Sequence, residues 1–152
     1  MLTYLQHRVM SVCFSADGKF IASGSKDETV KVWSVGSSGD FECQSTLGVD
    51  AGFFGVQSVS FSPKGDVIAA GCSNGKIYLV DALAGEVKST LNVGRVNSVS
   101  FSPDGEFIAA AYYGDIQIVK AQTGEIFQSL WGHTRYVPTL SCSACFLSRV
   151  GC

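Results

Sequence analysis

Few side chains in this sequence have the types and spacing that catalysis or metal binding requires. Cys142 and Cys145 are separated by two residues, which is half of a zinc-binding pattern, and His133 and Cys152 flank the pair. A structural zinc ion needs four ligands in compact pairs, and the second pair is missing. We therefore expect no metal site. We expect the six cysteines to be free thiols, since the first ten residues make a poor signal peptide.

The remaining candidates do not combine into a catalytic group. Ser23 begins a Ser-Gly-Ser sequence, but no histidine and acid are placed to activate a serine there. His7 and His133 are the two histidines of the chain, and both precede expected strands. Motifs of nucleotide-binding loops, metalloproteases and serine hydrolases are absent from the sequence. The sequence therefore predicts neither an enzyme nor a cofactor.

Length and composition describe one folded domain. The chain has 152 residues, of which 46% are hydrophobic and 16% are charged, and its net charge is -2. Because no block of like charge occurs, neither a nucleic-acid surface nor a polybasic membrane tether is expected. No apolar stretch approaches the roughly 20 residues that a membrane helix needs. We expect a cytoplasmic or nuclear protein.

One pattern recurs along the chain and determines the expected fold. Val9, Val56 and Val96 each begin a Val-x-Ser-Val-x-Phe-Ser strand and a turn ending in glycine, while a fourth copy at Val137 soon loses the pattern. Three further strands follow in each unit, at Phe20–Gly24, Thr29–Trp33 and Glu42–Leu47, at Val67–Gly71, Lys76–Val80 and Glu86–Leu91, and at Phe107–Ala111, Asp115–Val119 and Glu125–Leu130. Alternating apolar residues and the lack of a helical window predict an all-β fold.

Four short antiparallel strands in a unit of about 40 residues make up one blade of a β-propeller. At this point the sequence resembles the WD40 repeat family. The segment Lys26-Asp-Glu-Thr-Val-Lys-Val-Trp-Ser34 is similar to the turn and third strand of that family, with Asp27 and Trp33 at the two signature positions. Leu130-Trp-Gly-His133 is similar to its Gly-His element, and the Phe-Ser-Pro-Asp-Gly turn is typical of it. The resemblance implies a WD40-type β-propeller fragment of four-stranded antiparallel blades.

The resemblance also implies a structural network of hydrogen bonds. In WD40 blades a histidine, a strand hydroxyl, the turn aspartate and the tryptophan can bond one another and join loops to strands. Ser23, Asp27 and Trp33 match these positions in the first unit, and His133 matches the histidine of a Gly-His loop. The second and third units carry valine in place of the tryptophan, so at most one blade is expected to be fully linked.

We expect this chain alone not to close a ring. The expected boundaries are 1–8 for the outer strand of a missing blade, 9–47, 48–91 and 92–131 for three blades, 132–144 for the start of a fourth, and 145–152 for a divergent tail. Propellers generally close with about four to eight blades. An open blade face exposes apolar surface beyond what soluble monomers show. Self-association of two chains would complete the ring.

The resemblance implies a non-catalytic scaffold that docks partner proteins or peptides on one face of the propeller. The positions that match the upper face of the family are Arg8, Met10, Lys26, Gln57, Ser73, Arg95, Asn97, Tyr113 and Tyr136. Arginine and tyrosine are common anchors of interfaces. Arg8, Arg95 and Arg135 on one rim would suit an acidic or phosphorylated peptide. Two alternatives stay open: a nonfunctional or truncated fragment of a longer WD40 scaffold, and part of a propeller enzyme of another family.

Overall fold

The computed structural model describes residues 8–133. The expected outer strand before Arg8, the rest of a fourth blade after His133 and the tail lie outside the described residues. Twelve β-strands make up the described part, namely β1 (Val9–Phe14), β2 (Phe20–Ser25), β3 (Thr29–Val35), β4 (Phe41–Gly48), β5 (Val56–Phe61), β6 (Val67–Cys72), β7 (Lys76–Asp81), β8 (Val87–Asn92), β9 (Ser98–Phe101), β10 (Phe107–Tyr112), β11 (Asp115–Lys120) and β12 (Ile126–Trp131). No helix among these residues could cross a membrane.

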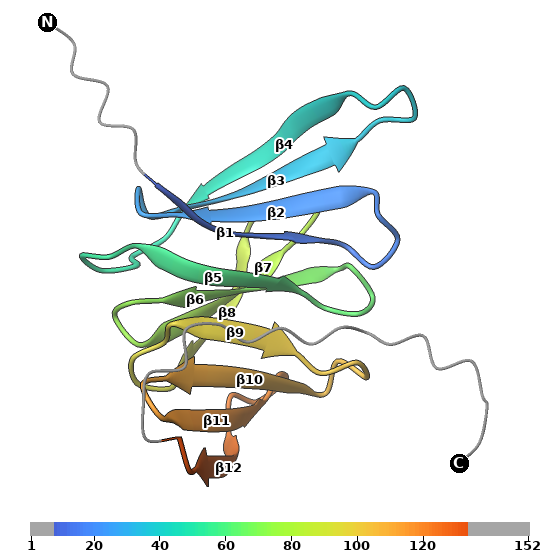
Figure 1. Ribbon diagram of the computed structural model, residues 1–152. Coiled ribbons are helices and arrows are strands. Elements are labelled where there is room, and N and C mark those ends of the chain that lie inside the picture. Colours follow the sequence, from blue (N-terminus) through green and yellow to red (C-terminus); the bar gives the residue numbers. More distant parts are fainter. Residues whose placement is uncertain (1–7, 134–152) are drawn as a thin grey trace, which may run out of the picture.

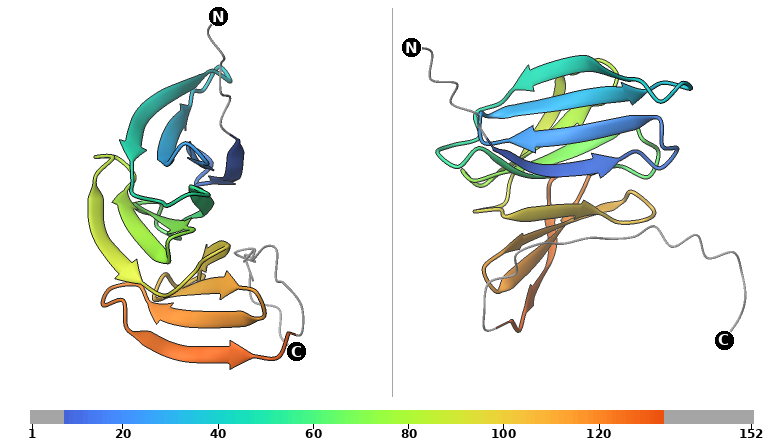
Figure 2. Two further views of the ribbon diagram at one scale, coloured as in Figure 1. Left: turned by 90° about the vertical axis from the view of Figure 1, so that its left-hand side faces the viewer. Right: turned by 45° about the horizontal axis from the view of Figure 1, so that its top comes forward.

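The strands form three antiparallel sheets of four strands each, paired in chain order from β1 to β4, from β5 to β8 and from β9 to β12. Figure 1 shows the sheets stacked one after another. In Figure 2 the inner strands β1, β5 and β9 follow one another, while β4, β8 and β12 lie along the outer side of a fan. The predicted all-β fold of propeller blades is therefore confirmed, and residues 8–133 do not close a ring.

A repeated turn joins the first two strands of each sheet. In the first sheet the Ser15 hydroxyl donates to the Asp17 carboxylate at 2.6 Å and accepts from the Phe20 N–H at 2.9 Å. Gly18 has a φ of 71°, which is the left-handed conformation that glycine adopts without strain. The Ser15 hydrogen bond lowers the pKa of Asp17, so that the turn is formed with a charged carboxylate.

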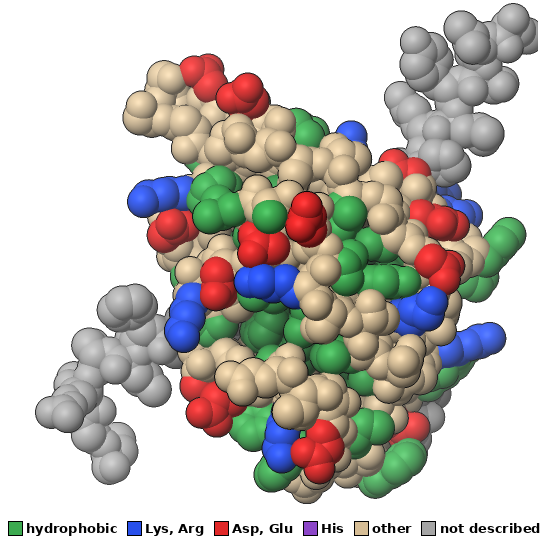
Figure 3. Space-filling model, turned by 180° about the vertical axis from the view of Figure 1, so that it is seen from behind, with side chains coloured by type: hydrophobic (Ala, Val, Ile, Leu, Met, Phe, Trp, Pro, Cys, Tyr) green, Lys and Arg blue, Asp and Glu red, His purple; other side chains and the backbone are tan. Residues whose placement is uncertain are grey.

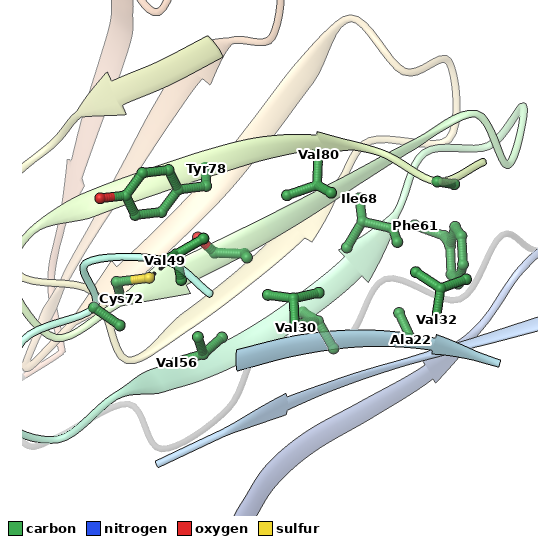
Figure 4. Close-up of a cluster of buried hydrophobic side chains, with 14 residues drawn as sticks. Ala22, Val30, Val32, Val49, Val56, Phe61, Ile68, Cys72, Tyr78 and Val80 are labelled. Atoms are coloured by element: carbon green, nitrogen blue, oxygen red, sulfur yellow. Dashed lines mark hydrogen bonds between the residues drawn. The ribbon is translucent and has the colours of Figure 1, made fainter. Parts of the chain in front are cut away.

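The two middle strands of the second sheet, β6 and β7, are buried on both faces because they are apolar in both registers. Tyr78 and Val80 of β7 point to the first sheet, whereas Ile77 and Leu79 point to the third. Figure 4 shows the first of these two cores, in which Val30 of β3 packs against side chains of β5, β6 and β7. Continuous apolar runs are what a strand covered on both sides requires. Packing between sheets therefore supplies the main stabilisation of the fold.

Glycine in the second strand allows the sheets to approach closely. A Cβ on Gly71 of β6 would lie 2.7 Å from Val99 Cγ1 and 2.8 Å from Val96 Cγ1. Gly24 has the same position in β2, where a Cβ would lie 2.6 Å from Val56 Cγ1. The small-residue character of these second strands is thus explained by the inner strand of the following sheet, which packs directly on them.

The outer face of β1 is an open blade face. Val12 and Phe14 are 64% and 65% exposed, although Val59 and Phe61, at the same positions of β5, are 4% and 8% exposed. The difference arises because β5 packs against the first sheet and no described element packs on this side of β1. At the other end of the fan, Trp131 of β12 is also exposed.

Candidate partner-binding face

One end of the fan is built from the connections into the inner strands and from the turns between the second and third strands. We call it the upper face, and it comprises Arg8, residues 26–28, 49–57, 73–75, 93–97 and 112–114. These segments lie on the left of Figure 1, and the left view of Figure 2 looks onto them. Nearly every sequence-predicted partner-binding residue that the structure describes lies here, since the repeat puts the same connection at the same end of each sheet.

A β-bulge interrupts each of the first two inner strands near this end. The pairing with the second strand shifts at Met10, between Val9 and Ser11, and likewise at Gln57. Bulges re-aim a side chain at the rim of a sheet. Gln57 Nε2 donates to the carbonyl of Phe54, which ties the bulge to the loop before β5. Asn97 holds the corresponding place before β9 in the third sheet.

A pocket opens on the upper face between the second and third sheets. We call it the inter-blade pocket. It has a volume of about 310 Å³. Five of the lining residues were predicted from the sequence as partner-binding positions, namely Gln57, Ser73, Arg95, Asn97 and Tyr113. The other six were not predicted for this role, and they are Gly52, Phe53, Phe54, Asn74, Val96 and Tyr112. The structure therefore brings together residues of both sheets that are up to 61 positions apart in the chain, from Gly52 to Tyr113.

Arg95 is held in place at the wall of this pocket. Its Nη1 donates to the Tyr112 hydroxyl at 3.0 Å, and its guanidinium carbon lies 5.9 Å from the centre of the Tyr112 ring. This hydrogen bond raises the pKa of Arg95 further, so the side chain stays charged. Tyr112 and Tyr113 meet edge to face, with ring centroids 4.4 Å apart. The arginine is thus oriented by aromatic side chains while its own surface remains exposed.

Two backbone and side-chain features at the pocket are uncommon. Tyr113 has a φ of 53°, a left-handed conformation that bulky residues rarely adopt. Asn97 Nδ2 is shielded from solvent and has no hydrogen-bond partner among the described residues. The backbone N–H of Asn97 donates to the Ala111 carbonyl at 2.8 Å, and this bond holds the Asn97 backbone against β10. Local backbone strain and unpaired buried donors both concentrate at binding sites.

Two aromatic residues of the loop before β5 form the edge of the pocket. Phe53 and Phe54 are 83% and 59% exposed, and their rings meet edge to face with centroids 5.1 Å apart. Lys26 Nζ lies 5.7 Å from the centre of the Phe53 ring, so the first sheet also reaches this loop. The sequence signal was available, because two adjacent phenylalanines between glycines are unusual in a loop, but exposure cannot be read from sequence.

The other predicted partner-binding residues do not line the inter-blade pocket. The Arg8 carbonyl accepts from the Lys26 N–H at 2.9 Å, so these residues adjoin on the first sheet. Met10 is 42% exposed in the bulge of β1. Tyr136 and Arg135 lie outside the described residues. The structure therefore assembles five of the predicted residues around one pocket, with the first-sheet residues beside it, and the five are Gln57, Ser73, Arg95, Asn97 and Tyr113.

The predicted structural network is divided between two sheets. Trp33 Nε1 donates to the Ser23 hydroxyl at 3.1 Å, and the Asp27 carboxylate accepts from the Thr29 N–H at 3.0 Å. His133 follows β12 in the third sheet, where its carbonyl lies so close to Gly114 that no Cβ would fit there. Of the four residues, Ser23 and Trp33 are therefore in direct contact, and His133 belongs with the upper face of the third sheet.

The cysteines of the described part carry no metal-binding arrangement. Residues 8–133 contain no group of three or more His, Cys, Asp or Glu side chains that could hold an ion. Burial raises the pKa of Cys13 to about 11 and that of Cys72 to about 12, so both are thiols at neutral pH. Cys43 is exposed, and all three are free. Cys142, Cys145 and Cys152 lie outside the described residues.

Two WD40 family models together match most of the chain. The model described as WD domain, G-beta repeat, matches residues 1–34 and 85–118, and the Anaphase-promoting complex subunit 4 WD40 domain matches residues 42–96. The chain belongs to the WD40 repeat family. Its sheets are accordingly WD40 blades, as the sequence predicted.

Relatives of this WD40 chain are longer than it is. It is 35% identical over 88 residues to the Ribosome biogenesis protein BOP1 homolog of Dictyostelium discoideum, an alignment that covers 55% of this chain and 10% of that protein. Among solved structures it is similar to U3-55K (18% identity, TM-score 0.76, 88% of this chain and 42% of the other). It is also similar to the RRP9 WD40 repeats (17% identity, TM-score 0.77, 88% of this chain and 42% of the other). A chain of the Mitotic Checkpoint Complex is similar as well (23% identity, TM-score 0.75, 90% of this chain and 41% of the other).

Proposed function

We propose that this protein is a non-catalytic scaffold that docks partner proteins or peptides on the upper face of its WD40 blades. The observation that carries the proposal is the inter-blade pocket, where exposed Phe53 and Phe54 adjoin an oriented Arg95. Exposed aromatic and arginine side chains around a concave site are the usual composition of an interface centre. WD40 proteins in general act as scaffolds, which supports a binding role over an enzymatic one.

The names of the relatives support protein assemblies as the setting. One relative is named a ribosome biogenesis protein, and one similar structure is a mitotic checkpoint complex. We extend the proposal to a partner within such a multiprotein assembly, in the cytoplasm or the nucleus. The chain spans one tenth of that curated relative and less than half of the matched solved chains, so the partner is to be sought for this chain itself.

Site-specific photo-crosslinking tests the docking face. Benzoylphenylalanine would be placed at position 113 on the upper face and, as a matched control, at position 64 in the β5–β6 turn at the opposite end of the sheet. We expect irradiation in cells to give discrete crosslinked species from position 113 and not from position 64. Equal crosslinking at both ends would contradict a dedicated upper docking face.

A second role, self-association, is favoured by the open blade face. We propose that the exposed Val12 and Phe14 of β1 pack on a further blade, as Val59 and Phe61 do within the chain. Light scattering across a tenfold concentration range should then show a discrete dimer that Val12→Asp dissociates. A mass of one chain at every concentration would instead favour the alternative, in which this open face is covered by further blades of a longer scaffold.

A further inference from the structure

We infer that the inter-blade pocket binds an aspartate or glutamate side chain of an extended partner peptide, with an apolar neighbour of that residue against Phe53 and Phe54. The inference rests on the proposed docking function and specifies the chemistry of the partner. It follows from the charge, the hydrogen-bonding groups and the apolar edge of the pocket.

The charge among the residues that line the pocket is positive. None of the lining residues is acidic, and Arg95 is the charged residue among them. Lys26 adds a second cation beside Phe53 at the edge. Asp115 lines a separate cavity of about 180 Å³ together with Arg95 and Tyr112, and it is not among the residues that line the inter-blade pocket. A single carboxylate of a partner therefore meets a complementary charge here.

One hydrogen-bond donor at the pocket has no acceptor in the described part of the chain. Asn97 Nδ2 is a donor without a partner in the described part of the chain, and it is shielded from solvent at the pocket lining. Gln57 Nε2, by contrast, is occupied by the Phe54 carbonyl. The guanidinium of Arg95 uses Nη1 for the Tyr112 hydroxyl and carries further N–H groups that this contact does not use. A carboxylate has two oxygens, so it can accept from Asn97 and from Arg95 together.

The edge of the pocket favours an apolar neighbour beside the acid. Phe53 and Phe54 are among the exposed large hydrophobic residues of the molecule, and they lie directly next to the lining glycine Gly52. Aromatic surface of this kind is stabilised when a partner side chain covers it. An extended peptide carries neighbouring side chains on opposite sides, and residues two apart on the same side, about 7 Å from each other. One residue of such a peptide can therefore reach Arg95 while another covers the phenylalanines.

A nucleic acid is the less suitable occupant. The net charge of the chain is -2, and the face next to the upper face, which Figure 3 shows from behind, mixes acidic and basic side chains without a field of one sign. Binding a polyanion requires several phosphate contacts spread along a positive surface. Arg95 and Lys26 offer two cations near one pocket, which is enough for a single carboxylate and too few for a strand of phosphates.

A peptide array tests this inference with the full chain. The array holds nine-residue peptides in which Leu or Phe accompanies Asp or Glu, and matched peptides in which Asn or Gln replaces each acid. The strongest acidic peptide is then measured in solution by fluorescence anisotropy. We expect the acid-to-amide change in that peptide to weaken binding about tenfold or more, which is typical of a lost charged contact.

Variants of the protein locate the contact. Arg95→Gln and Asn97→Asp should each weaken binding of the acidic peptide about tenfold. Asn97→Asp is nearly isosteric and replaces the unpaired donor with a second carboxylate. Lys64→Gln removes one positive charge at the opposite end of the sheet and should change binding less than about twofold. Circular dichroism melts of each variant confirm folding, and the acid-to-amide comparison in the unaltered protein needs no variant.

Several outcomes would overturn the inference. They are an array without preference for acids, equal losses for Lys64→Gln and Arg95→Gln, or tighter binding of a twelve-nucleotide uridine RNA than of any acidic peptide. Photo-crosslinking at position 113 separates this failure from failure of the proposed function. Crosslinks that persist there without an acidic preference leave the docking face intact and reject the carboxylate. If neither crosslinks at position 113 nor a preference for acidic peptides is found, the docking face is rejected as well.

Discussion

The hydroxyl of Ser11 accepts a hydrogen bond from the backbone N–H of Val59 at 3.1 Å, and this contact joins the inner strand of the first blade to that of the second. The Ser58 hydroxyl accepts from the Val99 N–H at 3.1 Å in the same way, one blade further along. These backbone donors belong to a different sheet from the serines, so no sheet ladder links the two strands. Serine in the repeated Val-x-Ser-Val strand therefore satisfies donors that strand pairing within a blade leaves unpaired.

Removing one of these hydroxyls should destabilise the packing between blades. Ser58→Ala leaves the buried Val99 N–H without a partner, which we expect to lower the free energy of unfolding by about 1–3 kcal/mol. Urea unfolding measures the change. Ser38→Ala, at an exposed turn serine, serves as the control and should stay within about 0.5 kcal/mol. Equal effects of the two variants would contradict a stabilising role for the inter-blade serines.

A methyl group on the second strand should force adjacent blades apart. Gly71→Ala would bring a Cβ within 2.7 Å of Val99, and we expect a loss of about 1–3 kcal/mol in unfolding free energy from overpacking. Gly48→Ala, at a glycine with no atom within 4 Å of the added Cβ, is the matched control. If both substitutions shift the urea midpoint alike, close approach of the blades is not the reason for glycine in β6.

Valine at one repeat position should contribute unequally in the two blades. Val59 is 4% exposed and Val12 is 64% exposed, so Val59→Ala should cost about 2 kcal/mol and Val12→Ala less than about 0.5 kcal/mol. The comparison is made by urea unfolding at a low protein concentration, where association is minimal. A large loss from Val12→Ala under these conditions would mean that a blade already covers β1.

The Trp33–Ser23 hydrogen bond should be measurable as a coupling energy. A double-mutant cycle of Trp33→Phe and Ser23→Ala should give about 0.5–1.5 kcal/mol, as is usual for a partly buried side-chain hydrogen bond. The same cycle with Ser89→Ala, in β8 of the second blade, should give additive effects. A zero coupling with Ser23 would show that Trp33 acts through packing alone.

Thiol reactivity should follow the burial of the three cysteines that the structure describes. Since burial raises the pKa of Cys13 to about 11 and of Cys72 to about 12, iodoacetamide at pH 8 should label Cys43 before Cys13 and Cys72 in the folded chain. Peptide mapping by mass spectrometry identifies the labelled residues.

The same raised pKa values predict a loss of stability at alkaline pH. The Cys13 and Cys72 thiols lose their protons at lower pH in the unfolded chain than in the folded one, so the free energy of unfolding should fall as the pH rises from about 9 toward 11. Cys13→Ala and Cys72→Ala together should flatten that alkaline slope.

The strands and their order in each blade could be predicted from the sequence because their causes are local. Alternation and turn residues predicted Phe20–Gly24, and β2 is observed as Phe20–Ser25. The differences from expectation lie at the ends of the strands. The third repeat matches from Val96, yet β9 begins only at Ser98, which pairs with Ala111 of β10, while the Asn97 N–H donates to the same Ala111 carbonyl. Each outer strand differed from expectation by one residue at both ends, where pairing with the third strand decides the boundary.

Five of the lining residues of the pocket were also foreseeable, because the resemblance to WD40 repeats assigns Gln57, Ser73, Arg95, Asn97 and Tyr113 to one end of the blades. Sequence alone could not supply Phe53 and Phe54, whose exposure depends on the path of a loop between two sheets.

By itself the sequence determined the all-β fold, the blade as its unit and the end at which the blades present their connections, since these depend on period and turn chemistry within about 40 residues. Only the tertiary structure decided which of two identical repeat positions is buried, as Val12 and Val59 demonstrate. It also decided that Arg95, Tyr112 and Phe53 face one pocket. Burial and pocket shape depend on contacts between residues far apart in the chain, and such contacts exist only once the blades have packed.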